Sequence, residues 1–303
     1  MGTPEFSIPT LEMVYTKFNV KAVFTQPPKP ANRGMKIKKS PVHLYSEKNN
    51  LQIFCPVKLN EKINEDEIKK INPDLIIVVA YGLIIPAKIL KIPKFGSING
   101  HASLLPKWRG ASPIQRSIEA GDKETGCTSM LMEKGLDTGP ILFQKKLKIN
   151  EHDDSIVIHD KLSKLTSVCL FETIIKFVNG TIQPSIQDQT QVSYANKLLK
   201  HEGLINWKLT AKEIYNKLRA FRAFPGTFTF LNCFKIKVID GYVNKKIHGS
   251  LPGTILSIDN TIVVACGNKT SFSITHIQKP GKRQLDTKTF LKGFSIKEGD
   301  CFD

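Results

Sequence analysis

Short apolar runs alternate with segments of helical periodicity over the first two-thirds of the chain. Val20–Thr25 and Leu75–Val79 are typical of strands, and the second is so aliphatic that we expect both of its faces to be buried. Apolar residues recur at helical spacing over Ser155–Val178, with Asp154 as a possible N-cap and Gly180 just past the end. This alternation predicts an α/β fold with a doubly wound, mostly parallel sheet.

The pattern changes toward the carboxyl end. Residues 183–191 are polar and have no period, and from Leu204 onward one helix, Ala211–Phe221, precedes short strands with frequent Gly and Asn. The expected strands are Phe228–Phe230, Lys235–Ile239, Gly253–Ser257, Thr261–Ala265 and Ser271–Ile277, spaced like those of a compact barrel. The 303 residues exceed the usual size of one domain, so we expect a first domain at 1–180, a linker at 181–203 and a small β domain at 204–303.

Three polar residues carry the clearest chemical signal. Asn99 and His101 lie two positions apart at the end of the apolar run Phe95–Ile98, so in a strand both side chains point to one face. Asp137 stands in the segment Gly135–Gly139, from where its carboxylate could hold the imidazole in one tautomer. The set suits acyl transfer without a covalent intermediate, because one group can manage the proton while another donates to the oxyanion. The alternative is a hydrogen-bonded cluster with a structural role.

The residues around this set resemble a known family. Asn99–Gln115 matches a formyltransferase signature, and Met1–Phe6, Val79–Pro86, Gly135–Gly139 and Phe224–Gly226 recur in the same order in its methionyl-tRNA formyltransferase branch. The resemblance covers nearly the whole chain. It implies transfer of the formyl group of 10-formyltetrahydrofolate to the α-amino group of methionine esterified to initiator tRNA. It also implies an OB-like carboxyl-terminal domain along the tRNA.

The resemblance assigns roles position by position. The catalytic set that it implies is Asn99, His101 and Asp137. The folate-binding set is Tyr81, Gly82, Leu83, Ser103, Leu104, Leu105 and Pro106, with the pterin read mainly by backbone groups around the first three. The sequence leaves open whether His101 acts as a base or as a cationic donor.

A second candidate site is the segment Pro27–Lys39, which we expect to be a long loop after a strand. It is dense in proline and positive charge, so ordering it against phosphates costs less than ordering a glycine-rich loop. The candidate tRNA contacts are Lys29, Arg33, Lys36, Lys38 and Lys39, and Arg33 is expected to matter most. A solvated loop without a partner is the alternative.

Composition agrees with an RNA partner without proving it. Lys and Arg number 44 against 27 Asp and Glu, a formal net charge of +17, although a lysine-rich proteome would give a similar excess. Further basic candidates in the last domain are Lys279, Lys282, Arg283, Lys288 and Lys292, each of which could equally be an ordinary solvated side chain.

Other features limit the remaining possibilities. The six cysteines have no C-x-x-C pair, and neither they nor the seven histidines have metal-ligand spacing, so we expect reduced thiols and no metal. We see no long apolar span for a membrane and no nucleotide-binding glycine motif. We expect a cytoplasmic protein that acts as a monomer.

The family pattern also raises a question about the start of the chain. Family members carry a short apolar strand before the Met-Gly-Thr-Pro-Glu-Phe motif, whereas this sequence opens at Met1 of that motif. Because that strand is central in a doubly wound sheet, we expect the natural start to lie upstream.

Competing functions use the same three residues. A glycinamide ribonucleotide formyltransferase lacks the second domain, and an amino-sugar formyltransferase differs around Trp108 and Gly135–Asp137. A formyltetrahydrofolate hydrolase would transfer the group to water and needs no basic loop. An RNA-binding module with an inactive core is the alternative outside enzymes.

Overall fold

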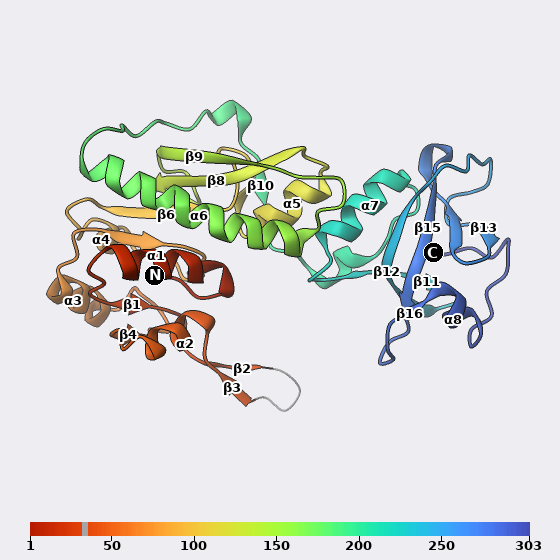
Figure 1. Cartoon of the computed structure of the whole chain (residues 1–303), viewed down its shortest axis with the longest axis horizontal. Coiled ribbons are helices and arrows are strands. Elements are labelled where there is room, and N and C mark those ends of the chain that lie inside the picture. Colours follow the sequence, from red (N-terminus) through yellow and green to blue (C-terminus); the bar gives the residue numbers. More distant parts are fainter. Residues whose placement is uncertain (32–35) are drawn as a thin grey trace. The chain divides into compact units, whose positions relative to one another are not determined.

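The computed structural model describes residues 1–31 and 36–303. Their contacts divide the chain into two units, and Figure 1 traces the elements of each. Unit 1 comprises Met1–Pro113, Glu124–Lys148 and His159–Ala195, and unit 2 comprises Ile114–Lys123, Ile149–Ile158 and Asn196–Asp303. No helix among the described residues is both long and apolar enough to cross a bilayer.

Unit 1 is built on two groups of strands. A four-stranded sheet has the order β5 (Ile76–Val78), β6 (Ser97–His101), β8 (Glu124–Leu131) and β9 (Ile141–Lys148). β5 and β6 are parallel, and β8 and β9 are added antiparallel. A separate parallel pair joins β1 (Val23–Phe24) and β4 (Ile53–Phe54). The α/β class expected from the alternating pattern is confirmed for this unit, with a sheet that is mixed on the side of β8.

Helices connect and cover these strands. They are η1 (Glu5–Ser7), α1 (Ile8–Lys17), α2 (Pro41–Lys48), α3 (Lys62–Ile71), α4 (Ala87–Leu90) and α6 (Ser155–Val178), which belongs to unit 1 from His159 onward. α6 runs along the sheet and has the predicted bounds (Figure 1). Its first turn is capped by Asp154, whose Oδ1 accepts from the backbone N–H groups of Ile156 and Val157 at 3.0 Å. At Gly100 the β6 backbone passes so near α6 that an added Cβ would lie 2.7 Å from Thr166.

The amino terminus lies between β1 and β5. The Met1 amine donates to the Ile77 carbonyl at 2.7 Å, and the Gly2 N–H donates to the Phe24 carbonyl at 3.0 Å. Burial lowers the pKa of this amine from 8.0 to about 5. An apolar cavity of about 470 Å³ adjoins Met1, between the same two strands and α1. Residues 1 and 2 therefore join the two groups of strands through main-chain hydrogen bonds.

The basic segment expected as a loop is partly a hairpin. β2 (Lys29–Ala31) pairs antiparallel with β3 (Lys36–Lys38), so Lys29 stands opposite Lys38 (Figure 1). The expectation of a loop is wrong at these positions, because proline is tolerated in a short edge strand that needs few ladder bonds. Arg33 lies outside the described residues.

Unit 2 consists of an antiparallel sheet with helices against it. The strands run in the order β11 (Thr227–Leu231), β12 (Phe234–Asn244), β15 (Ser271–Gln278), β14 (Ile262–Ala265) and β13 (Ile255–Ile258), with β16 (Leu285–Asp286) beside β15. The helical elements are α5 (Pro113–Glu119), which belongs to this unit from Ile114 onward, η3 (Lys200–Gly203), α7 (Ala211–Ala220), η4 (Gly267–Lys269) and α8 (Thr287–Leu291). The small β domain expected from the sequence is confirmed, and its five predicted strands correspond to β11 through β15.

The central cluster of unit 2 is apolar. Trp207 stacks on Phe302 with ring centroids 5.6 Å apart, and the buried Phe272 lies in the same cluster. The indole N–H of Trp207 donates to Thr229 Oγ1 at 2.9 Å, so its polar atom is satisfied inside the core. α7 begins with a capping box in which Thr210 and Glu213 bond each other's backbone N–H groups.

The expected linker carries structure in its first part. Residues 181–195 belong to unit 1 and include η2 (Gln189–Gln191) and β10 (Tyr194–Ala195), which pairs parallel with β7 (Arg109–Gly110). The domain boundaries at residues 180 and 204 remain a prediction for domains that fold independently.

Candidate active site

Asn99 and His101 lie within a strand and not after one. β6 extends to His101 because its last residues pair with β8, Asn99 opposite Met130 and His101 opposite Thr128. Positions two apart in a strand share a face, as the sequence pattern predicted. Both side chains are buried, with 9% and 7% of their surface exposed. The strand therefore fixes the amide and the imidazole relative to each other.

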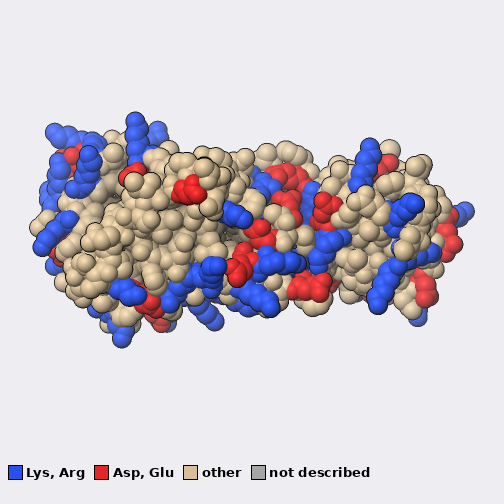
Figure 2. Space-filling view, turned by 90° about the horizontal axis from the view of Figure 1, so that it is seen from above, with Lys and Arg blue, Asp and Glu red and all other residues tan. Residues whose placement is uncertain are grey.

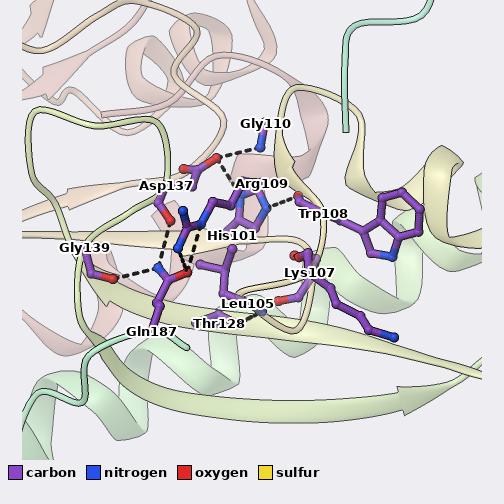
Figure 3. Close-up of polar contacts among 11 residues, drawn as sticks. His101, Leu105, Lys107, Trp108, Arg109, Gly110, Thr128, Asp137, Gly139 and Gln187 are labelled. Atoms are coloured by element: carbon purple, nitrogen blue, oxygen red, sulfur yellow. Dashed lines mark hydrogen bonds and ion pairs between the residues drawn. The ribbon is translucent and has the colours of Figure 1, made fainter. Parts of the chain in front are cut away.

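The His101 ring is held on both sides (Figure 3). Its Nε2 lies 2.9 Å from the carbonyl oxygen of Trp108, and its Nδ1 lies 3.6 Å from Oδ2 of Asp137. A carbonyl oxygen only accepts hydrogen bonds, so Nε2 carries a proton in this arrangement. Nδ1 is left facing the carboxylate, slightly beyond hydrogen-bond distance.

Asp137 reaches the histidine from a loop between β8 and β9. Its Oδ2 accepts a hydrogen bond from the Gly110 N–H at 2.8 Å, which fixes the carboxylate beside the ring. Its backbone has φ 51°, in the left-handed region that Asp tolerates better than most residues. The structure therefore brings His101 and Asp137 together, as expected from the sequence, with Asn99 on the same face of β6.

Left-handed backbone occurs at the site, as it also does at several positions elsewhere in both units. Besides Asp137, Ala80 just after β5 has φ 47° and Trp108 has φ 64°. Alanine and tryptophan gain nothing from this conformation, which costs roughly 1–2 kcal/mol for each. Such strain is found mainly where the surrounding structure imposes it, often at functional sites.

Two further buried polar residues adjoin the site and were missed from the sequence. Arg109 has 2% of its surface exposed, and its guanidinium donates from Nε and Nη2 to Oε1 of Gln187 at 3.0 and 2.8 Å. Gln187 lies in the segment expected to be a linker. Their separation of 78 positions leaves no local pattern that would pair them. The signal available in the sequence is Arg109 itself, which precedes Gly110 in the motif that follows His101.

The expected folate-binding residues lie at two places in unit 1. Tyr81 is buried, and its carbonyl accepts from Thr3 Oγ1 at 2.7 Å and from Gln26 Nε2 at 3.1 Å. Gly82 has φ 79° and an exposed backbone, and the partly exposed Leu83 follows it. Internal partners thus occupy the Tyr81 carbonyl, whereas Gly82 is exposed, with the Gln26 side chain filling the space that a Cβ at Gly82 would take.

The second group follows His101. Ser103 has no exposed surface and donates to the Lys107 carbonyl at 2.6 Å. The Leu105 N–H donates to Thr128 Oγ1 at 3.0 Å. Leu104 and Pro106 are partly exposed. Ser103 and Leu105 therefore shape the connection, and Leu104 and Pro106 are the members available to a ligand.

The basic hairpin presents lysines to solvent. Lys38 is exposed, and Lys39 forms an ion pair with Glu47 at 2.5 Å. Lys29 is exposed and donates to Gln26 Oε1 at 2.6 Å. A surface depression of about 380 Å³ is lined by Lys38, Lys39 and Lys48 among others. The backbone of Lys36 lies in β3 opposite residue 31.

Basic side chains are spread over the surface, as Figure 2 shows for one face, where they are mixed with fewer acidic ones. Among the candidates in unit 2, Lys279 is held by its own unit, since its Nζ donates to the Gly293 carbonyl at 3.0 Å and lies 4.5 Å from the Phe294 ring centroid. The other four are exposed: Lys282, Arg283, Lys288 and Lys292. Among the described residues, no group of three or more His, Cys, Asp or Glu side chains is arranged to hold a metal ion.

Two family models of one enzyme class match successive parts of the chain. A family model described as formyl transferase matches residues 10–174, and one described as formyl transferase, C-terminal domain, matches residues 197–295. Together they cover most of the chain, which places it among the formyl transferases.

Curated relatives narrow the class. The chain is 39% identical over 303 residues to a methionyl-tRNA formyltransferase of Nitrosomonas eutropha, covering 99% of this chain and 96% of the relative. It is 41% identical over 306 residues to a methionyl-tRNA formyltransferase of Caldicellulosiruptor saccharolyticus, covering 99% and 97%. The chain belongs to the methionyl-tRNA formyltransferase family.

Solved structures share the fold at lower identity. An N-formyltransferase from Helicobacter canadensis, in complex with folinic acid and dTDP-3-aminofucose, has a TM-score of 0.67 at 19% identity and covers 90% of this chain and 96% of its own. HypX from Aquifex aeolicus, in complex with tetrahydrofolic acid, has a TM-score of 0.58 at 18% identity and covers 86% and 48%.

Proposed function

We propose that this protein transfers the formyl group of 10-formyltetrahydrofolate to the α-amino group of methionyl initiator tRNA, for the start of translation. The observation that carries the proposal is the identity of about 40% to methionyl-tRNA formyltransferases across both units. A folate-type donor is further supported by the folinic acid and tetrahydrofolic acid in the structures of two proteins with a similar fold. We place the reaction in the cytoplasm and assign it to a monomer without a metal.

The site must stabilise the developing oxyanion and must transfer a proton. The methionyl nitrogen attacks the formyl carbon, and negative charge grows on the formyl oxygen until the bond to N10 breaks and tetrahydrofolate leaves. Asn99 can donate its amide N–H to that oxygen from the face it shares with His101. One hydrogen-bond donor of this kind typically contributes about a hundredfold or more to the rate.

The second requirement is proton transfer. His101 lies 3.6 Å from the Asp137 carboxylate, which orients the ring and stabilises any positive charge that it acquires. The amine must lose a proton as it becomes an amide, and N10 must gain one as tetrahydrofolate leaves, so the two changes balance. His101 can carry this proton from the amine to N10, or can donate to the oxyanion while the proton passes to N10 through water. In both cases Asp137 acts through His101, so both residues belong to the catalytic set.

The binding assignments form part of the proposal. The folate lies along the backbone at Tyr81, Gly82 and Leu83, and along the connection from Ser103 to Pro106 in which Leu104 and Pro106 are partly exposed. The hairpin lysines, Lys29, Lys36, Lys38 and Lys39, together with Arg33, contact the tRNA backbone.

The deciding experiment offers four acceptors to one donor. Formyl transfer from 10-formyltetrahydrofolate is measured to methionyl initiator tRNA, glycinamide ribonucleotide, an amino-sugar nucleotide and water. Transfer to the charged tRNA in strong preference to the other three supports the proposal. Equal or faster transfer to another acceptor contradicts it and reassigns the same site to that acceptor.

A further inference from the structure

Gln187 connects the two loops that hold the candidate catalytic pair. Its Nε2 donates to the carbonyl oxygens of Asp137 at 2.8 Å and Gly139 at 2.7 Å, while its Oε1 accepts both hydrogen bonds from Arg109 (Figure 3). Its side chain is 3% exposed. An amide has one acceptor group and two donors, and all of them are used here.

Arg109 stands between the two main-chain groups that touch the catalytic pair. Trp108 gives the carbonyl next to the His101 ring, and Gly110 gives the N–H bound to Asp137. A shift of the Arg109 side chain therefore moves both groups. Gln187 fixes that side chain on one side and the Asp137 main chain on the other.

The residues that follow Gln187 brace the same loop. Ser193 Oγ accepts from the Trp108 N–H at 3.0 Å, and the Ser193 carbonyl accepts from the Arg109 N–H at 2.9 Å. The Ala195 carbonyl then accepts from Ala111 at 2.8 Å, next to the β7–β10 pairing. The loop from Trp108 to Ala111 is thus held along its length by a segment more than 80 residues away in sequence.

We infer that Gln187 is a positioning residue of the catalytic site: it sets the distance between His101 and Asp137 by joining Arg109 to the Asp137 loop. This inference rests on the proposed function, in which those two residues act together. Reacting groups displaced by about 1 Å can cost about a hundredfold in rate, so a residue that touches no substrate can still control kcat. If Gln187 had only a structural role, its substitution would lower stability without altering the geometry of His101 and Asp137.

Gln187→Glu separates the two hydrogen-bonding roles. The carboxylate keeps an acceptor for Arg109 and adds an ion pair, so the core contact persists. It presents an oxygen in place of an N–H to the carbonyls of Asp137 and Gly139, which repels the Asp137 loop. Gln187→Met removes both roles at similar length. Gln183→Glu is the matched control, because Gln183 is exposed in the same segment.

The first readout is steady-state kinetics with methionyl-tRNA and 10-formyltetrahydrofolate. We expect Gln187→Glu to lower kcat by about 10- to 100-fold with both KM values within about threefold, and Gln183→Glu to leave both unchanged. We also expect kcat of Gln187→Glu to recover toward low pH relative to the wild type, since a protonated carboxyl can again donate to the Asp137 carbonyl. A folded Gln187→Glu protein with wild-type kcat overturns the inference.

The second readout does not need turnover. The ring nitrogen resonances of His101, assigned by NMR with a His101→Gln reference, should move in Gln187→Glu and Gln187→Met and stay in place in Gln183→Glu. Unmoved resonances in the Gln187 variants overturn the inference whatever the kinetics. If the resonances move in the Gln187 variants while the wild-type protein formylates no acceptor, the positioning role is supported and the proposed function is rejected, so the two failures are distinguishable.

Discussion

The site around β6 in unit 1 and the core of unit 2 bury different kinds of side chain, although unit 1 also has an apolar cluster beside β5. At the site, His101, Arg109 and Gln187 are buried; His101 bonds the Trp108 carbonyl, and Arg109 bonds Gln187. Unit 2 buries rings and aliphatic groups around Trp207 and Phe272, and forms a continuous apolar cluster. Hydrogen bonds specify positions, whereas apolar burial mainly supplies stability. We therefore expect mutations in the first region to change chemistry and mutations in the second to change unfolding.

The largest effect should come from His101. We expect His101→Ala to lower kcat by roughly a thousandfold, because the ring that faces both Trp108 and Asp137 is removed from the reacting centre. The measurement is single-turnover formyl transfer, alongside tRNA binding by filter retention, which should stay within about twofold. The matched control is His276→Ala in unit 2, which should retain activity. Comparable losses in both variants would remove the contrast between the units.

The next effect concerns stability. Phe272 has no exposed surface in the unit 2 cluster, so we expect Phe272→Ala to lower the free energy of unfolding by about 3–5 kcal/mol. Phe234 in β12 is 65% exposed, and Phe234→Ala should cost less than about 1 kcal/mol. Urea unfolding followed by tryptophan fluorescence measures both. A folded Phe272→Ala protein should keep its kcat, and a fall in kcat without loss of stability would contradict the division of roles.

A third effect concerns the buried Met1 amine, which is present only in a chain that begins at Met1 as in the printed sequence. Its pKa falls from 8.0 in the unfolded chain to about 5 on folding, so the unfolded state binds the proton more tightly. Stability is then complete above pH 8 and is lost as the pH falls toward 5, by about 2 kcal/mol between pH 8 and pH 6. Thermal unfolding across this range measures it. A chain acetylated at Met1 should lose this component of the pH dependence, and an unchanged dependence would reject the assignment.

The smallest effect is expected at the hairpin. We expect Lys38→Ala to raise KM for the tRNA about threefold and to reduce the slope of affinity against salt by about one, because one phosphate contact is lost. Lys70→Ala on α3 is the control, since Lys70 is exposed and paired with Glu67. Equal effects of the two substitutions would indicate general charge attraction in place of a defined contact.

Local signals made much of the fold predictable. α6 was predicted from its helical spacing with Asp154 before it and Gly180 after it, and the Asp154 cap is present. The strands of unit 2 were predicted because each is short and bounded by turn residues. β1 is shorter than the run from Val20 to Thr25, since only two residues find a partner in β4. Strand length depends on the neighbour as well as on the run itself.

The site residues that stand in a sequence motif were predictable, whereas those that reach the site only through tertiary contacts were not. His101 and Asp137 stand in recognisable segments and lie together as expected. Gln187 lies in a polar stretch without a period, and the partners of its side chain are at least 48 positions away. Such pairs are set by the tertiary fold, so a single sequence holds no direct trace of them.

The interleaving of the two units also has a consequence for how the chain is made. Unit 2 takes Ile114–Lys123 and Ile149–Ile158 from the middle of the sequence and its remainder from Asn196–Asp303. During translation these inner segments emerge long before their partners, and at about 5–20 residues per second they wait on the order of ten seconds. When Ala195 has just emerged from the ribosome, the nascent chain contains all of unit 1 but only the two inner segments of unit 2. Contact with the ribosome or a chaperone at that stage would protect these two segments from aggregation until the rest of unit 2 is made.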